Sequence, residues 1–454
     1  VGSEMCIRDS LLTLLIISPR ETGKTLVNNF GGVRPDGSNA TIIGKNPGEF
    51  IPDRNNLSRV WMDHGVWPFK TINLYINQTG DTDILFEKAP YFETKKTGPV
   101  IEHILLEHKR PFKKIGRHGN FLLEGGDWND GLDMAQEKGE SVAFTAAYAG
   151  NLTELAGLLE KISYKKPIIR ELRQKADRIK EHIQKKEWIT VRSGHGFFNG
   201  YYDNNGRRVE GDHKNGVRMT LTGQVFPIMS GAATKEQAKE AYRSAKKYLW
   251  DKKLRGFRLN TDFGEIYPDL GRAFSFAYGE KENGGFFSHM NVMFANALYQ
   301  RGLAGEGYEV LESIYNMCVN TQTSKIYPGL PEYFNSDGRG MYHYLTGSAS
   351  WLVLTILTQV FGIRGDMGDL VIDPKLVKEQ FKRSRTISVE TRFAGRNIKI
   401  NYINPEKLDY GKYSVKEILL NNKRVTGMPI TRRVFLDLAS KSSMNTIDVI
   451  LASS

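Results

Sequence analysis

The chain has 454 residues, 40% hydrophobic and 11% aromatic, which suits packed domains and excludes a disordered protein. Its formal net charge of +12 suits an anionic partner such as phosphate. Nucleic acid fits poorly because Lys and Arg are spread along the chain. Two cysteines exclude a disulfide framework and a cysteine-based zinc site, so we expect a cytoplasmic protein.

The first residues do not read as part of a native domain. Residues 1–10, VGSEMCIRDS, are expected to be a non-native head, and the predicted helical domain begins at residue 11. We expect native sequence to be missing upstream. The apolar run at 11–17 is far shorter than the roughly 18 residues that cross a bilayer, so we expect no membrane partner.

Helical patterns alternate with glycine-rich loops between residues 11 and 365. Residues 139–162 are small and apolar on most faces, whereas 168–186 are strongly amphipathic, which predicts an inner and an outer helix. Further helices are expected at 65–78, 82–93, 234–250, 290–303, 306–319 and 348–361. The alternation predicts a mainly α chain built as an (α/α)6-type helical barrel, incomplete at its start. An irregular helical bundle is the alternative.

The pattern changes near residue 365. Short runs rich in Ile and Val alternate apolar and polar residues, with turn residues between them. The expected strands are LVIDP, TISVETRF, NIKINYI, VKEILLNNKRV, RVFLDL and TIDVILA. Residues 366–454 are therefore predicted to form a C-terminal antiparallel β-sandwich.

The segment GGDWNDG at 125–131 is the first candidate site. Its glycines permit unusual backbone conformations and close approach of a ligand. Trp128 beside Asp127 and Asp130 suits a sugar, because the ring stacks on C–H faces while the acids bind hydroxyls. The alternative is a surface turn, since Asp, Asn and Gly are common turn residues.

Glycine-rich segments that lead into helices are candidate anion sites. His289 lies at one such helix entry, and Thr346 with Gly347 at another. A helix N-terminus offers free N–H groups and a positive dipole end, both of which suit phosphate. The alternative is that His289 is a helix cap or a core residue.

Two reaction types fit these residues. Two carboxylates about 6.5–9.5 Å apart serve an inverting hydrolase, in which one of them activates water. A phosphate nucleophile arrives already anionic, and then one acid and an anion pocket are enough. The residue spacing leaves both reactions open.

The motifs resemble glycoside hydrolase family ninety-four, the inverting phosphorylases of β-glucosides. The resemblance runs from about residue 30 to about 375. It rests on GDWNDG followed by GESV, on KENGGFFSH, and on YLTGSASW followed by FGIRGD and LVIDP. Family enzymes are much longer and begin with a large β-sandwich that this chain lacks.

The resemblance assigns roles on the saccharide side. It implies that Asp130 is the general acid, that Trp128 borders the sugar, and that Asp127 supports the loop. It further places Asp63 and His64 near the substrate. The GLDMA continuation of the motif favours an oligoglucan over cellobiose.

The resemblance also assigns a phosphate site. It implies phosphate contacts from His289, Thr346, Gly347 and Gln224. Inorganic phosphate would be a co-substrate, with no cofactor and no metal. Family members form dimers, so a homodimer is one expectation.

Two rival functions remain open. An inverting β-glucoside hydrolase on a similar barrel needs a base, and Glu282 or Glu332 could supply it. The other rival is a truncated, inactive protein that binds carbohydrate without turnover.

Overall fold

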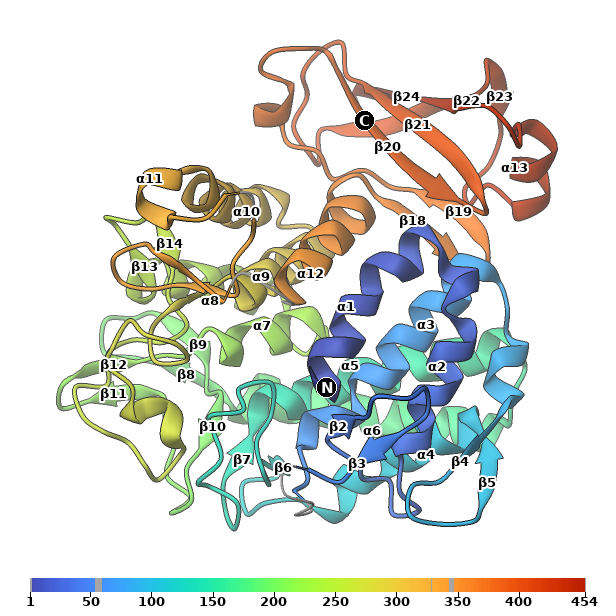
Figure 1. Ribbon diagram of the computed structural model, residues 1–454. Helices are drawn as coiled ribbons and strands as arrows, with labels where there is room; N and C mark the ends of the chain where they lie inside the picture. The colour runs from blue at the N-terminus through green and yellow to red at the C-terminus, as the bar shows by residue number, and fades with distance from the viewer. Residues whose placement is uncertain (1, 54–58, 328, 343–346, 454) are drawn as a thin grey trace.

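The computed structural model describes residues 2–53, 59–327, 329–342 and 347–453. A large helical part is followed by a smaller part built on a sheet, which lies at the top of Figure 1. The predicted order, a helical domain followed by a sheet domain, is confirmed at this level.

A set of inner helices forms the centre of the helical part. These helices are α1 (Glu4–Ile17), α3 (Trp67–Thr79), α5 (Val142–Lys161), α7 (Thr222–Met229), α9 (Ser288–Gln300) and α12 (Gly347–Thr355). Helix α1 packs against α3 and α12, α12 against α9, α9 against α7, α7 against α5, and α5 against α3. The contacts thus return to α1, where the hydroxyls of Thr13 and Ser350 lie 3.0 Å apart.

Small and apolar residues explain why these helices are inner ones. Every residue of α7 is buried, and so is every residue of α9 before Gln300. Gly150 of α5 lies so close to α7 that a β-carbon there would be 2.9 Å from that of Ser230. The prediction of a buried helix at 139–162 is confirmed by α5.

Amphipathic helices cover the inner ones. They are α4 (Val100–Lys109), α6 (Lys166–Lys186), α8 (Lys235–Tyr248) and α10 (Ala304–Val319). Helix α6 packs on α5, α8 contacts α7, and α10 packs on α9. Helix α8 begins with a capping box in which Thr234 and Gln237 bond each other's backbone N–H.

The helix predicted at 82–93 is wrong. The segment forms a 3-10 turn, η5 (Asp83–Phe86), and then strand β4 (Lys88–Pro90), which pairs with β5 (Thr97–Pro99). Pro90 explains the difference, because proline removes a backbone donor and disrupts a helix interior.

Short elements connect the helices. The helical ones are η1 (Pro19–Glu21), α2 (Gly23–Asn29), η2 (Phe30–Gly32), η4 (Met62–Gly65), η6 (Arg110–Lys113), η7 (Arg272–Ser275), α11 (Thr321–Ser324) and the π-helical η8 (Ile356–Val360). The strands are β1 (Gly2–Ser3), β2 (Ile42–Ile43), β3 (Phe50–Ile51), β6 (Phe121–Leu122), β7 (Glu140–Ser141), β8 (Trp188–Thr190), β9 (Gly196–Phe198), β10 (Tyr201–Tyr202), β11 (Gly211–His213), β12 (Gly216–Arg218), β13 (Trp250–Asp251), β14 (Gly256–Phe257), β15 (Phe286–Phe287), β16 (Tyr333–Phe334) and β17 (Gly340–Met341).

The C-terminal part combines a hairpin with a larger sheet. The hairpin is β18 (Ile363–Asp366) and β19 (Asp369–Ile372), and η9 (Lys378–Phe381) follows it. Strands β20 (Thr386–Phe393), β21 (Arg396–Ile403), β22 (Tyr413–Leu420), β23 (Lys423–Val425) and β24 (Asn445–Ser453) form a sheet in the order β20-β21-β24-β22-β23. The expectation of a purely antiparallel sandwich is wrong, because β21 and β24 are parallel.

The strand predicted at RVFLDL is a helix, and this explains the parallel pair. Helix α13 (Arg432–Leu438) begins after Thr431, whose hydroxyl accepts from the N–H of Val434 at 3.4 Å. Phe435 and Ala439 are buried four residues apart while Val434 is exposed, which is the spacing of one helix face. Helix α13 lies in the connection between β23 and β24, and this crossover allows β24 to run parallel to β21.

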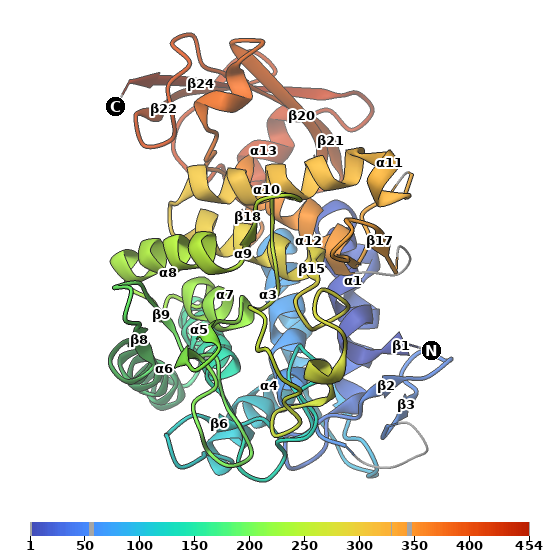
Figure 2. The ribbon, with the colours of Figure 1, turned by 90° about the vertical axis from the view of Figure 1, so that its left-hand side faces the viewer.

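The two parts share a boundary core. Tyr299 and Ala304 of the helical part pack with the hydrophobic core of the sheet, and Figure 2 shows α10 running below that sheet. Among the described residues, no helix is both long and apolar enough to span a membrane.

Candidate active site

The GGDWNDG segment is a loop between β6 and β7, just before α5. The chain around residue 60 runs beside it. Gly125 N donates to Val60 O at 2.9 Å, and Met62 N donates to Gly126 O at 3.0 Å. Every residue of the loop is buried except Asp130. The loop is therefore part of the folded interior, and the surface-turn alternative does not describe it.

Two successive Asx turns shape the loop. Asp127 Oδ1 accepts from Asn129 N, and Asn129 Oδ1 accepts from Gly131 N, each at 3.0 Å. Gly126 has a φ of 136°, which favours glycine. A β-carbon at Gly131 would lie 2.8 Å from that of Ala273, so only glycine fits this contact.

Asp127 anchors the loop to helix α5. Its side chain has no exposed surface, and Oδ2 accepts from the Ser141 hydroxyl at 2.8 Å. Ser141 is also the N-cap of α5, where its oxygen accepts from Phe144 N at 3.1 Å. Burial raises the pKa of Asp127 to about 6. These contacts tie the loop to α5, and the supporting role of Asp127 in the enzyme stays a prediction.

Asp130 points the other way. Its side chain is 42% exposed, and Oδ2 lies 3.3 Å from Nη2 of Arg272 on η7. Arg272 also pairs with Asp133. Asp127 and Asp130 thus have different surroundings, because one carboxylate is buried against α5 and the other is exposed beside Arg272.

The acidic neighbours of Asp130 are Glu282 and Glu332. Burial raises the pKa of Glu282, and the charge of Asp130 adds to this rise. Burial raises the pKa of Glu332 to about 7, with further contributions from Glu282 and then Asp130. In the described part of the chain, no group of three or more His, Cys, Asp or Glu residues is arranged to hold a metal ion.

Trp128 joins the loop to the start of α9. Its indole Nε1 donates to Nδ1 of His289 at 3.2 Å, and its ring meets that of Phe287 edge to face at 5.6 Å. Because Nδ1 of His289 accepts, the ring proton is on Nε2. Burial lowers the pKa of His289 to about 3, so the imidazole is neutral. Two predicted site residues far apart in the sequence are thus in direct contact.

Asp63 and His64 lie on η4, at the flank of the loop. Both are buried. Asp63 Oδ2 accepts from Trp67 Nε1 at 2.8 Å, and the His64 ring stacks on Trp61 with centroids 5.8 Å apart. These contacts support the start of α3. A substrate role for the pair stays a prediction.

The structure does not support Gln224 as a phosphate ligand. Its side chain has no exposed surface. Its oxygen accepts from Phe198 N at 2.9 Å, and its nitrogen donates to Phe198 O and Thr220 O at 2.9 and 3.1 Å. Both amide protons are used inside the protein, because α7 places Gln224 against β9.

The second predicted helix entry is described only in part. Thr346 lies outside the described residues, whereas Gly347 is the first residue of α12. One helical turn further, the Trp351 ring has its centroid 6.1 Å from that of His289. The start of α12 therefore lies close to the start of α9.

Two arginines beside the loop were not predicted. Arg59 Nε donates to Gly125 O at 3.0 Å, and the guanidinium lies over Trp61, 4.3 Å from the ring centroid. Arg272 contacts Asp130 as described above. Arg59 lies in an irregular segment, and Arg272 lies on the short helix η7. Neither is at a fixed distance in sequence from GGDWNDG, so the sequence gives no indication that they approach the loop.

Comparison with known proteins identifies the family. The Glycosyl hydrolase 94 superfamily, catalytic domain, matches residues 25–362, which is well over half of the chain. The chain therefore belongs to this family. The predicted resemblance is confirmed.

Individual relatives are distant and longer. The chain is similar to the solabiose phosphorylase of Paenibacillus borealis, with 26% identity over 328 residues, 69% of this chain and 41% of that protein. It is also similar to the cellobionic acid phosphorylase of Neurospora crassa, with 26% identity over 387 residues, 79% of this chain and 45% of that protein. The chain thus spans less than half the length of both.

A solved structure shows a similar fold. A GH78 family rhamnosidase of Bacillus sp. GL1 superposes with a TM-score of 0.55 at 12% identity, covering 90% of this chain and 39% of that one. At this identity the likeness concerns the fold alone.

The anchor of the loop can be tested by replacing Ser141 with alanine. The change removes a hydrogen bond to buried Asp127 and the cap of α5, so the free energy of unfolding should fall by about 2–4 kcal/mol. Exposed Ser443, replaced in the same way, should change it by less than about 0.5 kcal/mol. Chemical denaturation measures both, and equal effects would contradict the anchoring role.

The raised pKa of Glu332 predicts a pH-dependent effect of Glu332→Gln. The pKa of Glu332 is about 7 in the folded protein against an ordinary value of 4.5, so between these pH values the carboxyl ionises in the unfolded chain but resists ionisation in the folded one. Wild-type stability therefore falls as pH rises through this range. Glutamine stays neutral. The thermal midpoint of the variant relative to wild type should therefore rise between about pH 4.5 and 7 and then level off. A constant difference across this range would show that Glu332 titrates normally.

Proposed function

We propose that the chain carries the catalytic part of an inverting phosphorylase of β-linked gluco-oligosaccharides. Inorganic phosphate attacks the anomeric carbon, the glycosidic bond breaks, and the products are α-glucose 1-phosphate and a shortened saccharide. The observation that carries the proposal is the placement of Asp130. The structure describes the whole GGDWNDG loop, and Asp130 is the one residue in it that is not buried. The loop lies within the residues that match the catalytic domain of the family.

The closed series of helix contacts supports an (α/α)6-type barrel as the frame of this site. Helices α5 and α9 both begin beside the GGDWNDG loop, through Ser141 and His289. Inner helices that begin at one end of a barrel bring their free N–H groups to that end. An anionic co-substrate is favoured there.

Asp130 is the proposed general acid. It must donate a proton to the leaving oxygen, whereas in this structure its Oδ2 is occupied by Arg272 at 3.3 Å. The mechanism therefore requires bound saccharide and phosphate to separate the two side chains. Arg272 is 43% exposed, which gives it room to turn away from Asp130. Trp128 is proposed as the wall of the sugar subsite.

His289 is proposed to bind phosphate as a neutral donor through Nε2. Its pKa of about 3 keeps the imidazole neutral near pH 7, and the Trp128 contact sets the tautomer. Thr346 and Gly347 remain the proposed partners at the start of α12. Arg59 and Arg272 add positive charge beside the loop. No other cofactor is proposed.

The hydrolase alternative rests on Glu332. With a pKa of about 7 and Asp130 close enough to raise it, this carboxyl could accept a proton from water. Phosphate needs no such base, so dependence of turnover on phosphate separates the two reactions. An oligoglucan substrate, a homodimer and a cytoplasmic location remain proposals.

The test is synthesis in the reverse direction. α-Glucose 1-phosphate is mixed with glucose and short β-gluco-oligosaccharides, and released phosphate is measured. Release should depend on the acceptor, and Asp130→Asn should lower it by about 10²–10⁴-fold, since the general acid is lost. Asp177→Asn, on the exposed face of α6, should leave it unchanged.

The chain should be tested beside a version extended upstream to the length of its relatives. If only the extended version releases phosphate, the added region holds contacts that turnover requires. No release from either version would overturn the proposal and favour carbohydrate binding without turnover.

A further inference from the structure

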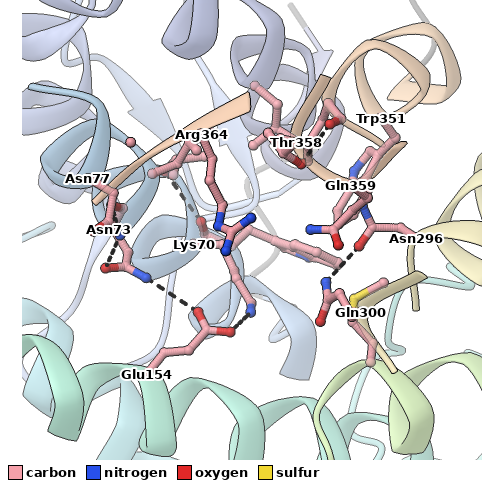
Figure 3. A pocket seen from close by; sticks show the side chains of 17 residues that line it. Lys70, Asn73, Asn77, Glu154, Asn296, Gln300, Trp351, Thr358, Gln359 and Arg364 are labelled. Atoms are coloured by element: carbon pink, nitrogen blue, oxygen red, sulfur yellow. Dashed lines mark hydrogen bonds and ion pairs between the residues drawn. The ribbon is translucent and has the colours of Figure 1, made fainter. Parts of the chain in front are cut away.

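A cavity of about 210 Å³ lies towards the ends of the inner helices that are far from the GGDWNDG loop. It is lined from α3, α5, α9, α12 and β18 (Figure 3). His289 begins α9 at the loop, whereas Gln300 ends α9 at the cavity, about 16 Å further along the helix. The cavity is therefore distinct from the site described above.

An aromatic layer separates the two. Trp67 meets Trp351, Phe144 and Phe226 edge-on, with ring centroids 6.0–6.5 Å apart. Trp67 and Trp351 also line the cavity. On the opposite side, Trp351 approaches His289. The tryptophans thus give the cavity an aromatic wall, which suits the apolar C–H groups of a sugar.

Two cations that line the cavity have carboxylate partners. Lys70 Nζ lies 2.6 Å from Glu154 Oε1, and Arg364 Nη2 lies 3.3 Å from Asp373 Oδ2. The remaining polar lining is dominated by neutral amides: Asn73, Asn77, Asn296, Gln300 and Gln359.

The amides present both donors and acceptors. Gln359 Oε1 accepts from Lys375 Nζ at 3.0 Å, which turns its NH₂ group towards the cavity. Gln300 Nε2 donates to Asn296 Oδ1 at 2.6 Å, so its oxygen remains an acceptor. Figure 3 shows the head groups of Gln300, Gln359 and Arg364 facing a common space. Sugar hydroxyls both donate and accept, and they match such a mixed set.

We propose that this cavity is a second binding site, for one neutral hexose. Its volume equals about seven waters, which suits a single pyranose ring and its hydroxyls. The apolar wall and the mixed amides together favour a neutral polyol. The inference rests on the cavity alone and does not require phosphorolysis.

Methionine methyl NMR tests the proposal, because Met229 lines the cavity and Met62 lies beside the catalytic loop. D-Glucose is titrated into the full chain carrying ¹³C-methyl methionine. The Met229 signal should shift saturably. Gln300→Leu and Gln359→Leu should each weaken its apparent Kd by up to about tenfold, the loss of one hydrogen bond. Asp130→Asn should leave that Kd unchanged.

Controls keep the result specific. Gln174→Leu, on the exposed face of α6, should have no effect, and an unshifted Met62 signal in the unliganded variants shows that they are folded. A Met62 signal that responds to glucose while Met229 stays fixed would overturn the proposal. So would a Met229 signal that responds to inorganic phosphate and not to glucose.

Discussion

The hydrogen bond between Ser141 and the buried carboxylate of Asp127 ties a glycine-framed loop to the first turn of α5. Because Asp127 also closes the first Asx turn, the same carboxylate determines how the loop folds. The next turn then directs Asp130 outward, where Arg272 meets it. The position of the proposed acid thus depends on a buried residue that anchors the loop.

The inner helices bring the rest of the site to this loop. Trp128 reaches the start of α9 through His289, and the start of α12 lies near that histidine. Burial makes His289 neutral, so it can contribute to phosphate binding as a hydrogen-bond donor and not as a cation. The positive charge comes from arginines of the irregular segments that flank the loop.

Sequence patterns were sufficient where one local rule decides the structure. The buried periodicity of α5, the capping box of α8 and the alternation of β20 and β21 were all predictable. Patterns failed where a single residue changed the outcome, as at Pro90 and at the Thr431 cap of α13.

The site was predictable in its motif but not in its orientation. GGDWNDG and His289 were identified, yet nothing local indicates that Asp130 is exposed or that Glu282 and Glu332 are its acidic neighbours. Gln224 was misassigned because its partners, Phe198 and Thr220, are fixed by tertiary packing. Arg59 and Arg272 approach the loop through long-range contacts that no spacing rule encodes.

The most direct test of the account is the identity and anomeric form of the first product. Time-resolved ¹H NMR would follow β-linked gluco-oligosaccharides with the chain extended to the length of its relatives, with and without inorganic phosphate. The account predicts α-glucose 1-phosphate, formed only when phosphate is present. Release of free α-glucose at the same rate without phosphate would contradict it and assign the site to an inverting hydrolase.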